Sequence, residues 1–297
     1  MNEEYLKYMT QEKLLLRRTA VENGFRDNNI DAAIKAVMVM AQETPFLFKF
    51  YRPRPHSIEA LLNSEIFMCR PSSYEDIGDN EYIPDIKSII KLYVEEVRKE
   101  QIPSTLLNDS FYQTMIDKMN ANPKFSDYKQ RIKDDFLTAC ITENFDEKMW
   151  TEYAQNGEGF CALYDTNQII VESQKLGYFF YPVRYVESRK DCQDIVFSAN
   201  EYGDGDQAYD SYKRKAYLSC LTKDILPYSS EGEWRMINLN PGLPEGKKGK
   251  NYPFIKPFII IAGENIGTNP EIEESLIDAS KQLGIELIKA SDYNNSR

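Results

Sequence analysis

The chain has little of what common catalytic centres need, since His56 is its only histidine. A Ser-His-Asp or Cys-His catalyst has no other base to use, and His56 lies between Pro55 and Ser57, where a capping or exposed role is the stronger interpretation. The five cysteines are odd in number and scattered, with no Cys-x-x-Cys pair. Zinc sites need clustered cysteine and histidine, so no metal site is predicted from these residues.

Excess positive charge is also lacking, because the formal net charge is -11 and the pI is near 4.9. An acidic surface argues against a broad nucleic-acid footprint but leaves room for a small basic pocket. No apolar run approaches the length of a membrane span, and Met1-Asn2-Glu3-Glu4 does not begin a signal peptide. With unpaired cysteines in apolar runs, these features predict a cytoplasmic protein with no membrane segment.

The order of apolar runs predicts an α+β fold with one mixed β-sheet as its core. The core domain is expected over residues 45–297, with a helical insertion at 83–136 punctuated by Pro103 and Pro123. Strands are expected at 45–52, 65–69, 137–141, 160–164, 179–186, 216–218, 233–239, 254–262 and 285–289, helices at 58–63, 146–155 and 270–283, and a glycine- and lysine-rich loop at 240–251.

Residues 1–44 form a predicted helical prefix, with a stop signal at Asn23-Gly24 and a second helix after Asn28-Asn29. Amphipathic helices mostly pack on their own domain, so a cap on the core is the first interpretation. The alternative is a face for a homo-oligomer or for a partner protein.

Trp150 and Tyr153 form an aromatic pair at i, i+3 spacing, which places two rings side by side on a helix. Core packing explains most such pairs. Gly157 and Gly159 follow and permit close approach of backbone or ligand at the next strand.

A second cluster is Glu231-Gly232-Glu233-Trp234-Arg235. On a strand, both glutamates and the arginine point to one side, and two close carboxylates repel, which separates their pKa values. Such a pair suits a reaction in which one carboxylate stabilises a sugar cation and the other handles a proton. The alternative is a surface ladder in which Arg235 neutralises Glu233 and Trp234 enters the core.

Lys49, Tyr51 and Arg52 end the first strand and offer cations and a hydroxyl to a phosphate or carboxylate. An ion pair with the acidic loop 75–81 is the competing interpretation. The same loop, through Glu75, Asp76 and Asp79, offers carboxylates to a divalent cation without matching an EF-hand.

In this order, the clusters resemble the bacterial family called domain of unknown function 2971. The resembling blocks are Phe48-Lys49-Phe50-Tyr51-Arg52, Tyr74-Glu75-Asp76-Ile77, Thr142-Glu143 with Met149-Trp150-Thr151-Glu152-Tyr153-Ala154 and Gly159-Phe160, and Lys223 with Glu231 to Arg235. The resemblance covers about residues 46 to 290 and leaves the prefix unmatched. The second block departs from the family pattern, with Glu75 for Asn and Ile77 for Pro.

That block pattern is in turn similar to the ADP-ribosyltransferase superfamily, which implies NAD as the substrate. Under this likeness Lys49 or Arg52 holds the pyrophosphate, Tyr51 helps to position it, and Trp150 or Tyr153 flanks the nicotinamide. Glu233 stabilises the oxocarbenium-like transition state and Glu231 orients the acceptor.

The resemblance therefore implies an enzyme that transfers ADP-ribose or hydrolyses NAD, as a toxin or defence effector, with a possible protein acceptor or regulator. Two alternatives stay open. One is a non-catalytic module of the same fold that binds a nucleotide or a protein. The other is a metal-dependent nuclease or phosphodiesterase that uses the acidic loop, against which the acidic charge weighs.

Overall fold

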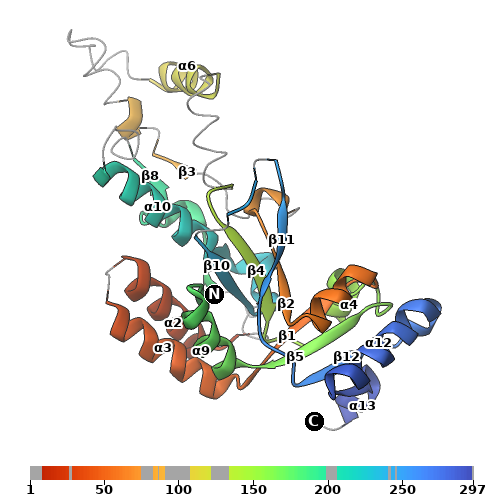
Figure 1. Cartoon of the computed structure of the whole chain (residues 1–297). Helices are drawn as coiled ribbons and strands as arrows, with labels where there is room; N and C mark the ends of the chain where they lie inside the picture. The colour runs from red at the N-terminus through yellow and green to blue at the C-terminus, as the bar shows by residue number, and fades with distance from the viewer. Residues whose placement is uncertain are drawn as a thin grey trace.

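The fold is built on one nine-stranded mixed sheet, seen in a computed structural model that describes residues 9–26, 29–74, 83–85, 87–90, 108–121, 134–198, 206–239, 242–244 and 246–295 (Figure 1). Strands follow the order β11-β2-β4-β1-β5-β12-β13, with β10 on β4 and β6 on β10. Their bounds are β1 Phe46–Tyr51, β2 Glu65–Cys69, β4 Leu137–Thr142, β5 Phe160–Asp165, β6 Phe179–Pro182, β10 Glu233–Asn238, β11 Gly249–Pro253, β12 Ile259–Ala262 and β13 Glu286–Lys289. Within this nine-stranded sheet, all pairings are antiparallel except that of β12 with β13. The predicted α+β class with a mixed sheet is therefore confirmed.

Two small parallel pairs accompany the main sheet: β3 (Ile83–Pro84) with β8 (Val196–Phe197), and β7 (Arg184–Val186) with β9 (Thr222–Asp224). The helices are α2 Gln11–Val21, α3 Ile30–Glu43, α4 Pro55–Leu62, α6 Asp109–Asn120, α8 Glu147–Tyr153, α9 Thr166–Leu176, α10 Asp206–Cys220, α11 Ile225–Tyr228, α12 Pro270–Leu283 and α13 Ala290–Asn295. Figure 1 shows α2, α3 and α9 together on the left, and α4, α12 and α13 on the right.

The sheet buries side chains on both faces, and the first five residues of β5, at its centre, are all buried. One face carries the main core, to which α3, α4 and α12 add buried side chains such as Met40, Leu61 and Leu276. The other face carries a smaller cluster in which Phe48 and Phe50 meet Met149 of α8 and residues near the C-terminus.

The sheet opens beside β4, and this opening places the candidate site. On one side of β4, β10 pairs with it along its whole length. On the other side of β4, β1 pairs with it only through Phe48 and Thr142, and β2 pairs with it only through Cys69 and Thr138. β1 and β2 therefore both diverge from the middle of β4.

The N-terminal helices pack on the same chain, with Val21 of α2 and Val37 of α3 inside the main core. Arg17 of α2 is fully buried and donates to the carbonyl oxygens of Val183 (3.0 Å) and Glu233 (2.8 Å). It also forms an ion pair of 2.8 Å with Glu143, at the end of β4. The prefix thus reaches the backbone of β10.

Several predicted elements differ from those observed. The strand predicted at 216–218 lies inside helix α10, because a short apolar run does not distinguish a strand from the buried face of a helix. The loop predicted at 240–251 contains the start of β11, an edge strand rich in polar residues. The stop signal at Asn23-Gly24 is instead a π-helical turn, Glu22–Arg26, that continues α2. Of the predicted insertion at 83–136, most residues lie outside the described part of the chain.

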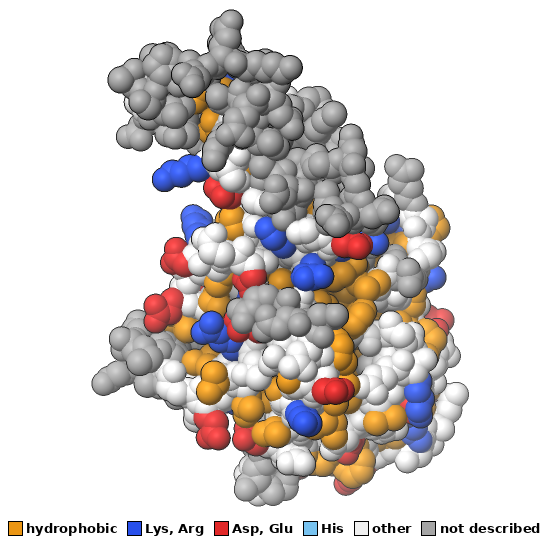
Figure 2. All heavy atoms as spheres, turned by 90° about the vertical axis from the view of Figure 1, so that its left-hand side faces the viewer, with side chains coloured by type: hydrophobic (Ala, Val, Ile, Leu, Met, Phe, Trp, Pro, Cys, Tyr) orange, Lys and Arg blue, Asp and Glu red, His pale blue; other side chains and the backbone are white. Residues whose placement is uncertain are grey.

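Figure 2 turns the left-hand side of Figure 1 toward the viewer and shows acidic and basic side chains interspersed among apolar ones on this face. Among the residues that the structure describes, no helix is both long and apolar enough to cross a membrane.

Candidate functional site

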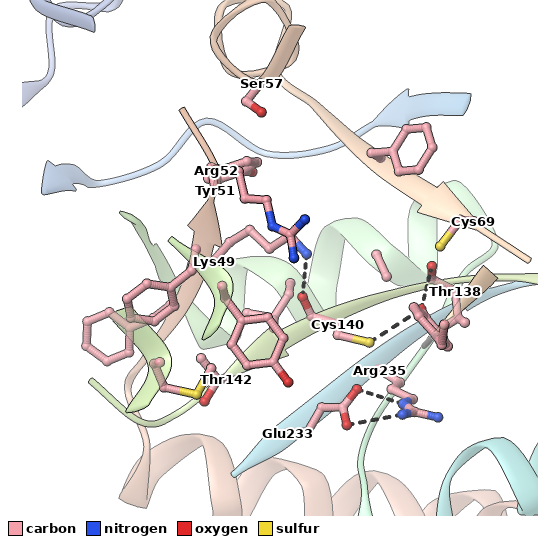
Figure 3. A pocket seen from close by; sticks show the side chains of 18 of the residues that line it. Lys49, Tyr51, Arg52, Ser57, Cys69, Thr138, Cys140, Thr142, Glu233 and Arg235 are labelled. Atoms are coloured by element: carbon pink, nitrogen blue, oxygen red, sulfur yellow. Dashed lines mark hydrogen bonds and ion pairs between the residues drawn. The ribbon is translucent and has the colours of Figure 1, made fainter. Parts of the chain in front are cut away.

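A pocket of about 510 Å³ fills the opening between β1, β2 and β4, within the size range of small-molecule sites. Figure 3 shows side chains of β1, β4 and β10 directed into it. One side, called here the cation wall, is formed by Lys49, Arg52, Arg54, His56 and Ser57. The opposite side, called the carboxylate wall, is formed by Glu231 and Glu233 with Lys223 and Arg235, and Tyr153 of α8 also lines the pocket.

Lys49 spans the gap between β1 and β4. Its Nζ donates to the Cys140 carbonyl oxygen at 2.8 Å (Figure 3). A strand carbonyl beside a gap needs a donor, because an unpaired buried backbone group is costly. The lysine therefore supplies a bond where β1 has left β4, and it brings a positive charge into the pocket.

The two glutamates of the carboxylate wall meet at one amine. Lys223 Nζ lies 2.8 Å from Glu231 Oε2 and 3.0 Å from Glu233 Oε2. Glu231 ends a 3-10 turn, Ser229–Glu231, rather than extending the strand, and Gly232 follows with a positive φ of 54°. This left-handed turn, which favours glycine, keeps both carboxylates on the side of Lys223.

Glu233 is held ionised. Burial opposes its charge, but the Arg235 guanidinium and the Lys223 amine outweigh burial and lower the pKa of this carboxyl well below its ordinary value. Arg235 donates to both carboxylate oxygens, at 2.7 and 3.2 Å (Figure 3). The guanidinium also bonds to the Cys220 carbonyl oxygen at 2.6 Å, which fixes its position.

Glu231 is shifted in the opposite direction. Burial raises the pKa of its carboxyl, the Lys223 amine counteracts burial, and the nearby Glu233 charge adds to the rise. The Tyr153 hydroxyl donates to Glu231 Oε1 at 3.4 Å, a long bond. The Thr142 hydroxyl fixes this turn by donating to the Glu231 carbonyl oxygen. Two adjacent carboxyls with pKa values displaced in opposite directions are typical of an acid-base pair.

Six of the seven residues singled out in the sequence line the pocket: Lys49, Tyr51, Arg52, Tyr153, Glu231 and Glu233. The Tyr51 hydroxyl nevertheless lies 3.4 Å from the Tyr164 hydroxyl, and burial raises the pKa of Tyr51 to about 12. That hydroxyl is therefore directed into the core.

Trp150 lies apart from the pocket. Its ring packs edge-on against Phe50, with centroids 5.0 Å apart, and against Phe145 at 5.5 Å. The i, i+3 spacing on the short helix α8 thus sends Tyr153 to the pocket and Trp150 to the smaller apolar cluster.

Sequence reasoning missed several lining residues. Lys223 is named in the sequence analysis only within a resembling block, and Arg54 and Ser57 are not singled out there. Pro55 is a favoured first residue of a helix and indicates that a helix starts between them. Tyr74 also appears only within a resembling block. Its ring lies under the Arg235 guanidinium, with 5.6 Å between the guanidinium carbon and the ring centroid.

Glu75, Asp76 and Asp79 of the predicted cation loop lie outside the described residues. Within the described ranges, no group of three or more His, Cys, Asp or Glu side chains is arranged to hold a metal ion.

These features define the class of protein: an α+β chain with a charged small-molecule pocket where its central sheet opens. The family model described as "Protein of unknown function (DUF2971)" matches residues 149–236, so the resemblance predicted from the sequence is confirmed over that segment. No curated protein and no solved structure matches the chain.

Proposed function

We propose that the protein uses NAD, transferring its ADP-ribose to an acceptor or hydrolysing it. The observation that supports this proposal is the opposition of the two walls across one pocket, with cations on one side and a carboxylate pair on the other. A dinucleotide needs both: positive charge for its pyrophosphate, and negative charge for the ribosyl cation that forms as nicotinamide leaves.

The cation wall supplies the first requirement. Lys49, Arg52 and Arg54 form no ion pair with the described part of the chain, and Figure 3 shows the Lys49 and Arg52 side chains directed toward the same space. In a chain of net charge -11, three cations at one pocket without an ion-pair partner among the described residues are a specific feature. The competing interpretation, an ion pair with the loop 75–81, concerns residues outside the described ranges. Guanidinium groups bind phosphate through paired hydrogen bonds.

The carboxylate wall supplies the second requirement. The bond between the ribose carbon and nicotinamide breaks, and the electron pair of that bond leaves with nicotinamide. Glu233 stays ionised and stabilises the positive charge that develops at the ribose carbon. Glu231, whose pKa is raised, accepts the proton of the attacking water or acceptor as the new bond to that carbon forms. The partly exposed Tyr153 ring flanks the nicotinamide. These roles need neither a histidine nor a metal.

Release of nicotinamide from NAD tests the proposal. Wild-type protein is incubated with NAD, with and without candidate protein acceptors, beside Glu231→Gln and the control Glu286→Gln on the exposed edge strand β13. Glu231→Gln removes the group that accepts the proton of the attacking water or acceptor, so it is expected to slow release about a hundredfold or more. The control should match wild type. Absence of release from wild-type protein under every condition would exclude an enzyme of this class.

A non-catalytic nucleotide-binding module is the second candidate, and the firm pairing of Glu233 with Arg235 and Lys223 favours it. Titration of NAD by calorimetry distinguishes the two: binding without nicotinamide release supports the module. A protein acceptor or regulator, and action as a toxin or defence effector, stay predictions.

A further inference from the structure

The beginning of helix α4 lines the pocket through Arg54, His56 and Ser57. Arg54 is the N-cap of this eight-residue helix, and no side chain caps the first turn. Pro55, at the first helical position, has no N–H, and the Ser57 N–H donates to the Arg54 carbonyl oxygen at 3.0 Å. The His56 N–H lies between them, and the helix dipole places partial positive charge at this end.

Ser57 adds a hydroxyl group to this end of α4. Its side chain is only 9% exposed, it lines the pocket, and its hydroxyl has no hydrogen-bond partner among the described residues. Figure 3 shows this hydroxyl directed from α4 toward the side on which Arg52 lies. Because this hydroxyl reaches the pocket and bonds no described protein group, it is available to donate to a ligand that enters there.

The cations nearest to this helix start decide the chemistry of that ligand. Arg54 is exposed at the N-cap, and Arg52 lies two residues earlier, at the end of β1. A hydroxyl donor, a helix N-terminus and guanidinium groups together suit a phosphate group. Lys49 lies deeper, on β1 at the gap, so positive charge extends inward from the helix start.

We propose that Ser57, Arg54 and the first turn of α4 bind one phosphate of a ligand whose second, linked phosphate lies against Arg52 and Lys49. The ligand is then a nucleoside diphosphate or a diester built on one, not a nucleoside monophosphate. This placement rests on the proposed function for its pocket, but it names different residues and does not require turnover.

Calorimetric titration with ADP, inorganic pyrophosphate, AMP and adenosine tests this assignment. Wild-type protein is expected to bind ADP and pyrophosphate more tightly than AMP, and adenosine least. Ser57→Ala removes one hydrogen bond to a charged group and is expected to weaken ADP and pyrophosphate binding roughly tenfold or more. Ser275→Ala is the control, because Ser275 lies on α12 and bonds only its own helix backbone, and it should change nothing.

Arg54→Gln is a second variant that disturbs no core packing, since Arg54 is exposed; it should weaken the same two ligands and reduce the dependence of binding on salt. Equal ADP affinity in wild type and both variants, or no ADP or pyrophosphate binding by wild type, would overturn the assignment. Nicotinamide release is measured separately. Weakened ADP binding in Ser57→Ala without any release from wild type retains the phosphate site and rejects the enzyme. Release with an unchanged KM for NAD in Ser57→Ala retains the enzyme and rejects the phosphate site.

Discussion

Glu233→Gln is expected to lower the free energy of unfolding by about 3–5 kcal/mol at neutral pH, the usual cost of breaking a buried ion pair. Glu233 is only 5% exposed and accepts from Arg235 at 2.7 and 3.2 Å and from Lys223 at 3.0 Å. The amide keeps one acceptor oxygen but leaves two buried cations facing the single charge of Glu231. The surface-ladder interpretation treats Glu233 as exposed, where the cost would be about 0–1 kcal/mol.

The loss should depend on pH with a definite sign. The pKa of Glu233 is lowered by folding, so its contribution to stability is complete above its ordinary value of 4.5 and is lost as pH falls below it. The difference between wild type and Glu233→Gln should therefore be large at about pH 7 and smaller at about pH 3.

Urea unfolding at both pH values, followed by tryptophan fluorescence, measures this difference, since Trp234 is fully buried beside Glu233. Glu286→Gln is the control and should change stability by less than about 0.5 kcal/mol. A loss below about 1 kcal/mol for Glu233→Gln, or a loss that is the same at both pH values, would show that the carboxylate is hydrated and would refute the reasoning.

Three further predictions follow from the same contacts. Arg17→Met should destabilise by about 3–5 kcal/mol, because Glu143 loses its fully buried partner and the Val183 and Glu233 carbonyl oxygens lose a donor. Lys13→Met removes the partly exposed partner of Glu143 and should cost about 1 kcal/mol or less; thermal unfolding compares the two variants, and equal losses would contradict this. Gly159→Ala should cost about 1–3 kcal/mol or more in urea unfolding, because its Cβ overlaps a backbone carbonyl of β1, while Gly267→Ala, with no atom closer than 3.6 Å, should be near neutral. Tyr153→Phe removes a donor to an ionised carboxylate, so the acidic limb of nicotinamide release should move to higher pH; an unchanged pH–rate profile would separate this tyrosine from the proposed base.

Elements with strong local signals were predictable from the sequence. The strand at 65–69 and the helix at 270–283 have their predicted bounds, and Gly284 ends that helix with a φ of 60°. Helix α9 was not predicted, although Asp165 caps it, because its apolar positions are few. The predicted strand at 216–218 is wrong for the opposite reason, since an apolar run fits the buried side of α10 equally well.

The candidate site was only half predictable. Glu231 and Glu233 stand out in the sequence as a charged cluster, and Tyr153 stands out through its i, i+3 spacing from Trp150. Ser57 carries no such signal, because its importance comes from where β1 leaves β4. That divergence is set by long-range strand pairing, which local sequence does not encode.

The opening beside β4 has a consequence for how such a protein changes over generations. The matched segment, 149–236, carries the carboxylate wall, whereas the cation wall lies on residues 49–57, outside that match. Under the proposed phosphate site, a substitution at the start of α4 changes which anion binds, while β10 keeps its pairing with β4. Selection can therefore exchange the ligand while the pair of acids is retained, so descendants of one ancestral chain can share an acidic centre and differ in what they admit to it.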